Sequence, residues 1–188
     1  MKKISLLWIL LILGIVTSSC NKKVSLQSYY VDKMEDASFL IVNVPFKLES
    51  LFKKNLSKDE QLTVSSIDKL NLLLFRPKED QIEKYQKELV VISEILDQER
   101  YQHLMNFRAF EKAEGTFLFE GTTEAIEEGI IFLKMGEKGF GVLRILGSDI
   151  NPASLVTLAK KVDPNLFKQQ LKFSFGSMEG LFSVEKKD

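Results

Sequence analysis

Cysteine is nearly absent from this sequence, which has 188 residues and a single Cys at position 20. The chain beyond Cys20 therefore has no disulfide and no thiol nucleophile. Histidine is equally scarce, with His103 alone, so a zinc site built from His and Cys ligands is excluded. The sequence also lacks an excess of one charge, because 26 basic residues balance 26 acidic ones. Nucleic acid would select a basic surface, so we expect no nucleic-acid partner.

Apolar and aromatic residues, by contrast, are present in the amounts of an ordinary globular protein. Hydrophobic residues make up 45% of the chain and include 14 Phe, whereas charged residues make up 28%. Disordered chains are poor in aromatic residues, and a chain of this length can bury a full hydrophobic core. The composition therefore predicts one folded domain that needs no covalent cross-link.

The first twenty residues have the organisation of a bacterial lipoprotein signal. Two lysines precede Ile4–Val16, an apolar run of 13 residues, whereas a bilayer-spanning helix needs about 20. Small residues at 17–19 then precede Cys20, and this arrangement resembles a lipobox, the motif at which the Cys thiol is acylated. The resemblance implies a signal peptide over 1–19, cleavage between Ser19 and Cys20, and lipidation of Cys20. The alternative is an uncleaved anchor in which the Cys is incidental.

The residues after Cys20 indicate which membrane the lipid anchor would enter. Asn21 follows the Cys, and by resemblance to Gram-negative lipoproteins a residue other than Asp favours the outer membrane. Lys22 and Lys23 come next, where lipoproteins exported to the cell surface carry acidic residues; the lysines are equally compatible with a solvated tether. We therefore expect a palmitate-bearing lipoprotein of the outer membrane that faces the periplasm. Residues 20–36 are polar and are interpreted as the tether.

Hydrophobic periodicity predicts the elements of the folded part. The predicted strands are, in chain order, Phe39–Val44, Leu70–Phe75, 104–109, Phe117–Glu120, Ile130–Met135 and Phe140–Leu146. The predicted helices cover 48–56, 79–100 and the segment from Pro152 to the residues before Pro164.

This order, β-α-β-α-β-β-β-β-α, predicts a single α+β domain over residues 37–188. The strand-helix-strand start favours a right-handed parallel crossover, and the later strands have the short connections of an antiparallel meander. We therefore expect a two-layer sandwich in which a mixed sheet carries helices on one face. In the C-terminal extension, the alternation of apolar residues over Leu171–Phe175 indicates a further strand at a sheet edge.

Several of these features together resemble one family. The lipobox-type leader, the strand-helix-strand start and the long helix are followed by meander turns at Glu114-Gly115 and Glu137-Lys138-Gly139. Gly147-Ser148-Asp149-Ile150 then leads directly into the last helix. Over residues 30–163 this pattern resembles the domain of unknown function 4252 family, small lipoproteins common in Bacteroidota. The resemblance implies the fold and an envelope location, but no activity, cofactor or catalytic residue.

Three features were weighed as catalytic or metal sites on their spacing. Asp149 and Asn151 offer two oxygens to Ca²⁺, but the glycine and terminal glutamate of a calcium loop do not follow, and the pair is interpreted as helix caps. Gly176–Gly180 has the composition of a nucleophile elbow without its order and is interpreted as a turn. His103 has no partner motif, so an ordinary surface or half-buried His is the simpler interpretation.

Two further patterns have structural interpretations. The glycines of Gly136–Gly141 join two strands instead of opening a helix, which indicates a hairpin rather than a dinucleotide site. Glu124, Glu127 and Glu128 form an acidic cluster of the kind used in glycoside hydrolysis. No second carboxylate stands opposite them at a readable spacing, so a solvated connector is the simpler interpretation. We therefore predict no catalytic residue, no cofactor and no metal ligand.

The sequence favours a non-enzymatic binding or structural module of the cell envelope, attached to the lipid bilayer through acylated Cys20. Its expected partners are envelope proteins, bound by strand addition at an exposed edge such as Leu171–Phe175. The rival is an envelope hydrolase whose Asp and Glu residues meet only in the fold, in a deep pocket with raised carboxyl pKa values. A small-ligand or lipid carrier, the third candidate, would need an apolar cavity between sheet and helices.

Overall fold

The computed structural model describes residues 23–44, 48–52, 55–78, 80–109, 113–163, 165–166 and 169. The predicted signal peptide, Cys20, the Leu171–Phe175 strand and the Gly176–Gly180 turn lie outside these residues. Within the described ranges, no helix combines the length and the apolar character that crossing a bilayer requires.

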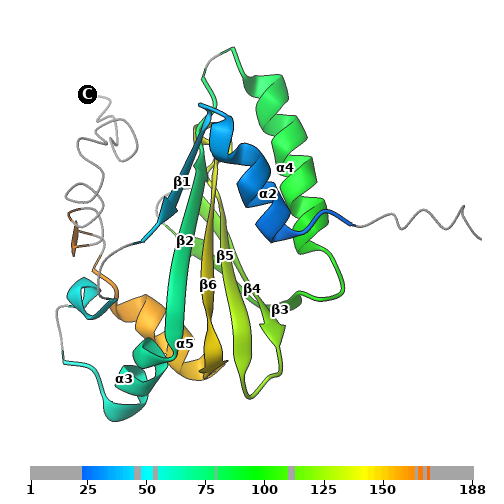
Figure 1. The fold of residues 1–188 in the computed structure, drawn as a ribbon. Coiled ribbons are helices and arrows are strands. Elements are labelled where there is room, and N and C mark those ends of the chain that lie inside the picture. Colours follow the sequence, from blue (N-terminus) through cyan, green and yellow to red (C-terminus); the bar gives the residue numbers. More distant parts are fainter. Residues whose placement is uncertain are drawn as a thin grey trace, which may run out of the picture.

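A six-stranded sheet forms the centre of the domain (Figure 1). Its strands are β1 (Phe39–Asn43), β2 (Ile67–Phe75), β3 (Gln102–Ala109), β4 (Ala113–Gly121), β5 (Ile126–Lys134) and β6 (Phe140–Ile150). They lie in the order β1-β2-β6-β5-β4-β3, and every neighbouring pair is antiparallel. The predicted α+β class and the meander of the last four strands are confirmed, and β1 and β3 are the edges of this sheet.

The predicted parallel crossover between the first two strands is wrong. β1 and β2 pair antiparallel, with Phe39 opposite Phe75. Their connection holds a 3-10 turn, η2 (Leu48–Leu51), and a helix, α3 (Lys58–Ser65). α3 packs against α5 (Pro152–Lys161) at one end of the sheet instead of crossing a sheet face (Figure 1). The chain therefore returns beside β1 in the opposite direction, and the sheet is antiparallel rather than mixed.

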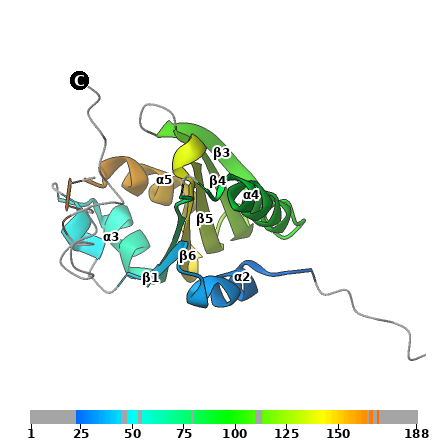
Figure 2. The same ribbon diagram turned by 90° about the horizontal axis from the view of Figure 1, so that it is seen from above.

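Two helices, α2 (Leu26–Asp32) and α4 (Ile82–Leu96), cover one face of the sheet (Figures 1 and 2). The core beneath them combines Leu26, Tyr29, Tyr30, Ile92, Ile95 and Leu96 with Leu73, Phe75, Leu118, Ile130, Phe132, Phe140 and Val142 of the strands. Burying a large apolar side chain contributes about 1.5–3 kcal/mol, so this layer is the main source of stability. α4 confirms the long helix predicted over 79–100, with shorter ends.

The opposite face of the sheet is also apolar, and α5 packs on it (Figure 2). On β6, Phe140 and Val142 point toward α2 and α4, whereas Leu143 and Ile145 join the cluster on the other side, which includes Leu155 of α5. The expectation of helices on one face only is therefore wrong. Its cause is that the strands carry apolar residues at both alternating positions, so both faces need cover.

The polar segment expected to serve as a tether contains α2, followed by a 3-10 turn, η1 (Lys33–Glu35). A capping box starts the helix: the side chain of Ser25 accepts from the amide of Ser28, and the amide of Ser25 donates to the Ser28 hydroxyl. So short a helix is marginal by itself, and Tyr29 is buried against the sheet. Residues 26–36 therefore belong to the folded domain.

Candidate functional site

β1 has an open outer edge among the described residues. The amide of Val44 donates to the carbonyl of Leu70 at 2.9 Å, which fixes the phase of the β1–β2 ladder. In an antiparallel ladder, successive residues alternately bond to the neighbouring strand and point away from it. The backbones of Phe39, Ile41 and Asn43 therefore point away from β2. Ile41 and Asn43 offer both N–H and C=O groups there, and no hydrogen bond from the described residues reaches them.

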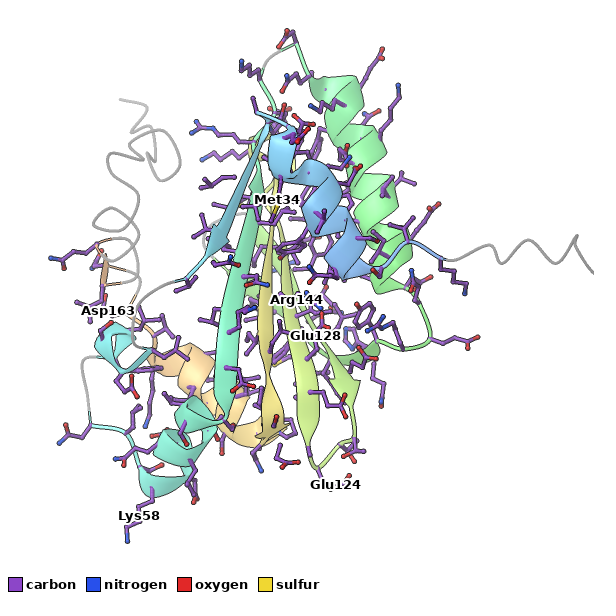
Figure 3. The ribbon with its side chains drawn as sticks, in the orientation of Figure 1. Met34, Lys58, Glu124, Glu128, Arg144 and Asp163 are labelled. Atoms are coloured by element: carbon purple, nitrogen blue, oxygen red, sulfur yellow. The ribbon has the colours of Figure 1, made fainter. Side chains whose placement is uncertain are left out.

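Two exposed apolar side chains lie on α2 and on η1, the turn that leads toward this edge. On the α4 side of α2, the Tyr29 hydroxyl and the Lys33 ammonium donate to Glu88 of α4 at 2.8 and 2.7 Å. Val31 of α2 and Met34 of η1 are 55% and 62% exposed. Figure 3 shows Met34 where α2 ends, beside the upper part of β1. The side of α2 that meets α4 also meets the start of β1, because the Tyr29 ring lies 6.1 Å and the Lys33 ammonium 5.6 Å from the Phe39 ring.

We call the outward backbone of Phe39–Asn43, together with the side chains of Val31, Met34 and Ile41, the β1 edge site. The strand reads Phe-Leu-Ile-Val-Asn, without a charged residue, a proline or a register shift against β2. Charged residues, prolines and register shifts are the features by which natural proteins prevent an edge strand from pairing with another strand, and β1 has none of them. The arrangement suits recognition of an extended segment, through main-chain hydrogen bonds and contacts to alternate side chains.

Three buried glutamates lie elsewhere, and each is paired with a cation of another element. The pairs are Glu60–Lys161 at 2.6 Å, Glu88–Lys33 at 2.7 Å and Glu128–Arg144 at 2.6 Å. They join α3 to α5, α4 to η1, and β5 to β6. Hydrogen bonds from Lys161 and from the Ser57 amide hold the pKa of Glu60 below its usual range. Each of these carboxylates thus joins two elements of the fold through its cation partner.

The Glu128–Arg144 pair is the centre of a polar cluster beneath α2 (Figure 3). Arg144 donates Nε and Nη2 to the two carboxylate oxygens at 2.6 and 3.0 Å, and Nη1 donates to Oε1 of Gln27 on α2. Asn71 lies opposite Arg144 in the ladder, and its Oδ1 is buried without a hydrogen-bond partner in the described part of the chain. Burial raises the pKa of the nearby Tyr101 phenol to about 12. The cluster ties α2 to the sheet.

A groove of about 290 Å³ lies between the end of β1, η2, α3 and the start of β2. Its lining residues are Val44, Leu48, Glu49, Val64, Ser65, Ile67, Asp68, Lys69 and Leu70. Glu49 and Asp68 are thus two carboxylates on one groove, as a hydrolase would require. Outside this groove, the carboxyl pKa values of Asp36, Glu60 and Glu124 are lowered. A general acid needs the opposite shift.

The acidic cluster weighed from the sequence is divided by the fold. Glu124 lies in the turn before β5 and is exposed, and Glu127 lies in β5 at the register shift between Ile126 and Glu128. Glu127 is exposed, whereas Glu128 is buried against Arg144. The solvated interpretation is therefore wrong for Glu128, because its carboxylate pairs with Arg144 of the neighbouring strand. His103 is exposed on β3, with Nε2 at 2.9 Å from Oδ1 of Asn106.

The helix cap predicted from Asn151 and Pro152 is confirmed at the start of α5. Asn151 accepts a hydrogen bond from the amide of Ser154 at 2.9 Å, and Pro152 begins α5. Asp149 has a left-handed backbone, with φ of 56°. In the portion of the chain that the structure describes, no group of three or more His, Cys, Asp or Glu side chains is placed to hold a metal ion.

Sequence reasoning placed the strand-addition edge at Leu171–Phe175 and did not single out β1 or the exposed apolar side chains of α2 and η1. The available signal was the uncharged run Phe39–Asn43, which the strand pattern identifies but does not place at an edge.

The fold and this site define a small α+β protein whose antiparallel sheet is packed on both faces and open at β1. Compared with protein families, the chain matches "Domain of unknown function (DUF4252)" over residues 29–158, and it belongs to that family. The match runs from α2 into α5 and includes the whole β1 edge site, so the resemblance noted from the sequence is confirmed. Comparisons with curated proteins and with solved structures each gave no match.

Proposed function

We propose that this protein is a lipid-anchored, non-enzymatic binding module of the cell envelope. It faces the periplasm and holds an extended segment of an envelope protein by strand addition at the β1 edge site. The observation that carries the proposal is the uncharged outer edge of β1, whose outward backbone groups have no hydrogen-bond partner among the described residues. The segment that leads into β1 carries two exposed apolar side chains, Val31 of α2 and Met34 of η1. An edge of this kind is a template for another strand.

The bound segment would lie antiparallel or parallel to β1 and exchange hydrogen bonds with Ile41 and Asn43. Alternate side chains of a strand point to opposite faces, so every second residue of the segment would lie on the side of Val31 and Met34. Apolar residues at those positions would remove both exposed side chains from water. The partner is therefore expected to offer at least five extended residues with apolar residues at alternate positions.

The anchor belongs to the same proposal. Residues 1–19 would be removed, and Cys20 would carry the lipid in the outer membrane, each buried methylene contributing about 0.8 kcal/mol to membrane binding. Cys20→Ala should abolish incorporation of radiolabelled palmitate and leave the precursor uncut. The conservative variant Ser18→Ala serves as the control and should still be labelled. Undiminished labelling of Cys20→Ala would refute the anchor.

Against the hydrolase, the buried glutamates are each paired with a cation, and the shifted carboxyl pKa values are low. Against the carrier, side chains of α2, α4 and the sheet pack together where an apolar ligand would have to lie. Neither alternative has an observation of its own that favours it over the open strand edge.

The test is site-specific photo-crosslinking in intact cells that make the full chain. A photoreactive residue replaces Val31 or Asn43 at the site, and in the matched control it replaces Val90, an exposed valine on the outer side of α4 (57% exposed against 55% for Val31). Crosslinked partner peptides are identified by mass spectrometry. A second variant, Ile41→Pro, removes the outward N–H of β1 and leaves its even-numbered residues bonded to β2.

We expect crosslinks from positions 31 and 43 to one segment of one envelope protein, with apolar residues at alternate positions. These crosslinks should fall at least tenfold in the Ile41→Pro background and should be absent from position 90. Equal capture at all three positions, or crosslinks that survive Ile41→Pro, would refute strand addition at β1. Turnover of an envelope polymer by the purified protein would favour the hydrolase instead.

A further inference from the structure

We infer that residues Leu171–Phe175 of this same chain occupy the β1 edge site as a seventh strand, so that a partner gains access only by displacing them. The inference concerns the regulation of the proposed binding site and rests on that proposed function. It is carried by three observations: the path of the chain after α5, the length of the following connection, and the pattern of apolar residues in the tail.

The chain that leaves α5 already pairs with the segment that follows β1. Val162 forms an antiparallel bridge with Phe52, and the amide of Asp163 donates to the carbonyl of Leu51 at 2.9 Å. The chain therefore passes η2 in the direction opposite to the segment that comes from β1. Residues 165, 166 and 169 are helical. If the tail resumes the direction of the Phe52–Val162 bridge after this turn, it meets β1 antiparallel, the orientation of every other pair in this sheet.

The connection is long enough for the remaining distance. Residues 164–170 are seven residues, which span about 10 Å as a helix and about 25 Å when extended. η2 is close to the end of β1, because Leu48 of η2 and Val44 line the same groove. Leu171 lies eight residues after Asp163, and Asn43 lies eight residues before Leu51, the hydrogen-bond partner of Asp163, so the two spacings match.

The pattern of the tail selects one register on β1. Leu171, Phe173 and Phe175 alternate with Lys172 and Ser174. One antiparallel register places the apolar residues of the tail on the face of Ile41. It pairs Leu171 with Asn43, Phe173 with Ile41 and Phe175 with Phe39. All three apolar side chains then share the face of Ile41, on the side of Val31 and Met34. A slip by one residue would put the lysine and the serine there instead, which disfavours it.

Attachment to the same chain favours this occupant over a free partner. A segment on a short flexible connection has an effective concentration in the millimolar range, far above that of an envelope protein in solution. The tail would also close an edge that carries none of the usual protection against aggregation. A partner must then bind the edge more tightly than the tail does, and removal of the tail should increase partner binding.

Disulfide trapping in the full-length protein tests the register. Directly opposed residues of antiparallel strands have Cα atoms about 5.5 Å apart, within the range of a disulfide. The variant Asn43→Cys/Leu171→Cys should oxidise to an intramolecular disulfide, detected by mass spectrometry of its proteolytic fragments. The matched variant Asn43→Cys/Lys172→Cys should form at least tenfold less, because its two side chains point to opposite faces.

Hydrogen exchange gives a readout that does not depend on cysteine. Truncation after Gln170 should accelerate exchange of the β1 peptide at least tenfold and leave the β3 peptide unchanged. If the truncated chain fails to fold, the full-length variant Phe173→Lys should have the same effect on β1. The same two changes should increase crosslinking of a partner at position 31.

The outcomes separate the inference from the proposed function. Equal trapping of both cysteine pairs, or β1 exchange that neither change accelerates, would overturn the inference, and partner crosslinks lost in Ile41→Pro would then still support strand addition. Preferred trapping at 171 without partner crosslinks in the truncated chain would support the tail as a seventh strand and refute the binding module.

Discussion

The two edge strands of the sheet, β1 and β3, differ in the features that hinder pairing with a further strand. β3 has a register shift against β4 between His103 and Met105, and it carries an exposed Arg108. The ring of Phe107 lies over Gly115 of β4 so closely that a Cβ at Gly115 would overlap with it. β1 has a regular register and no charged residue.

This difference shows that edge protection is a local property of each strand, not a property of the sheet. A bulge and charged side chains interrupt the row of groups that a further strand would need, and β3 has both. β1 offers that row unbroken, with apolar contacts beside it. The difference between the two edges therefore lies in a few residues, and substitutions can test each of them.

The largest expected effect comes from Arg144→Met. This substitution would break the Glu128–Arg144 ion pair between β5 and β6, which lie in the middle of the sheet between its two edges. The substitution leaves Glu128 buried without its cation, and breaking such a pair costs about 3–5 kcal/mol of the free energy of unfolding. Urea unfolding measures that loss. Hydrogen exchange should then accelerate in β1 and β3 alike. Acceleration at one edge alone would show that the two edges unfold independently. Arg108→Met, on the surface of β3, should change stability by less than about 0.5 kcal/mol.

A pair of proline substitutions tests the phase of the β1 ladder. Leu40→Pro removes a hydrogen bond to β2, whereas Ile41→Pro removes an N–H that points outward. Leu40→Pro should therefore be less stable by about 1–3 kcal/mol, as measured by thermal or urea unfolding. Equal stabilities, or the reverse order, would mean that the outward groups of β1 have been assigned to the wrong residues.

Gly115→Ala tests whether Phe107 fixes the β3 edge. The added methyl group would displace the ring, which lies at the end of a partly exposed side chain, so the expected loss of stability is about 1 kcal/mol. Exchange should accelerate in β3 and not in β1. In the Phe107→Ala background, Gly115→Ala should lower the free energy of unfolding only slightly, because the overlapping ring is gone. An unchanged cost in that background would rule out the proposed contact.

The smallest expected effect is a pH dependence confined to the β1 side. Lys84 of α4 donates to Asp36, just before β1, at 2.8 Å and lowers the pKa of that carboxyl. A lowered folded-state pKa gives stability that is complete above the ordinary Asp value of about 3.9 and is lost as the pH falls through the folded value. Both side chains are partly exposed, so the contribution is below about 1 kcal/mol. Lys84→Met should remove this acid dependence, as followed by stability measurements between pH 5 and 2.

Elements with strong local signals could be predicted from the sequence. α4 follows from its apolar stripe, α5 from Asn151 and Pro152 at its start, and the last hairpin from the glycines at 136 and 139. In each case the signal lies within a few residues of the structure that it specifies. Tertiary contacts confirm these elements but are not needed to propose them.

The elements that were missed depend on distant contacts or on weak patterns. The helix expected over 48–56 is only the 3-10 turn η2, while α3 starts at a capping box formed by Ser57 and Glu60. That motif was readable, but the helix after it has no apolar stripe. α2 is short, and its burial depends on the sheet.

The candidate site required the strand order, which no local pattern contains. β1 is an edge strand because β2 pairs on its other side with β6, which is more than sixty residues away along the chain. Met34 resembles any other apolar residue until the fold packs η1 against β1. The strand at Leu171–Phe175 stays a prediction.

The serine cap at the start of α2 also limits how far this domain could travel. Only four residues, 21–24, separate Cys20 from Ser25, and a fully stretched chain of that length reaches less than about 20 Å. With Cys20 as the attachment point, the domain would stay within one molecular diameter of the lipid headgroups. It would then meet proteins that project from the same membrane, and components deeper in the periplasm would be beyond its radius.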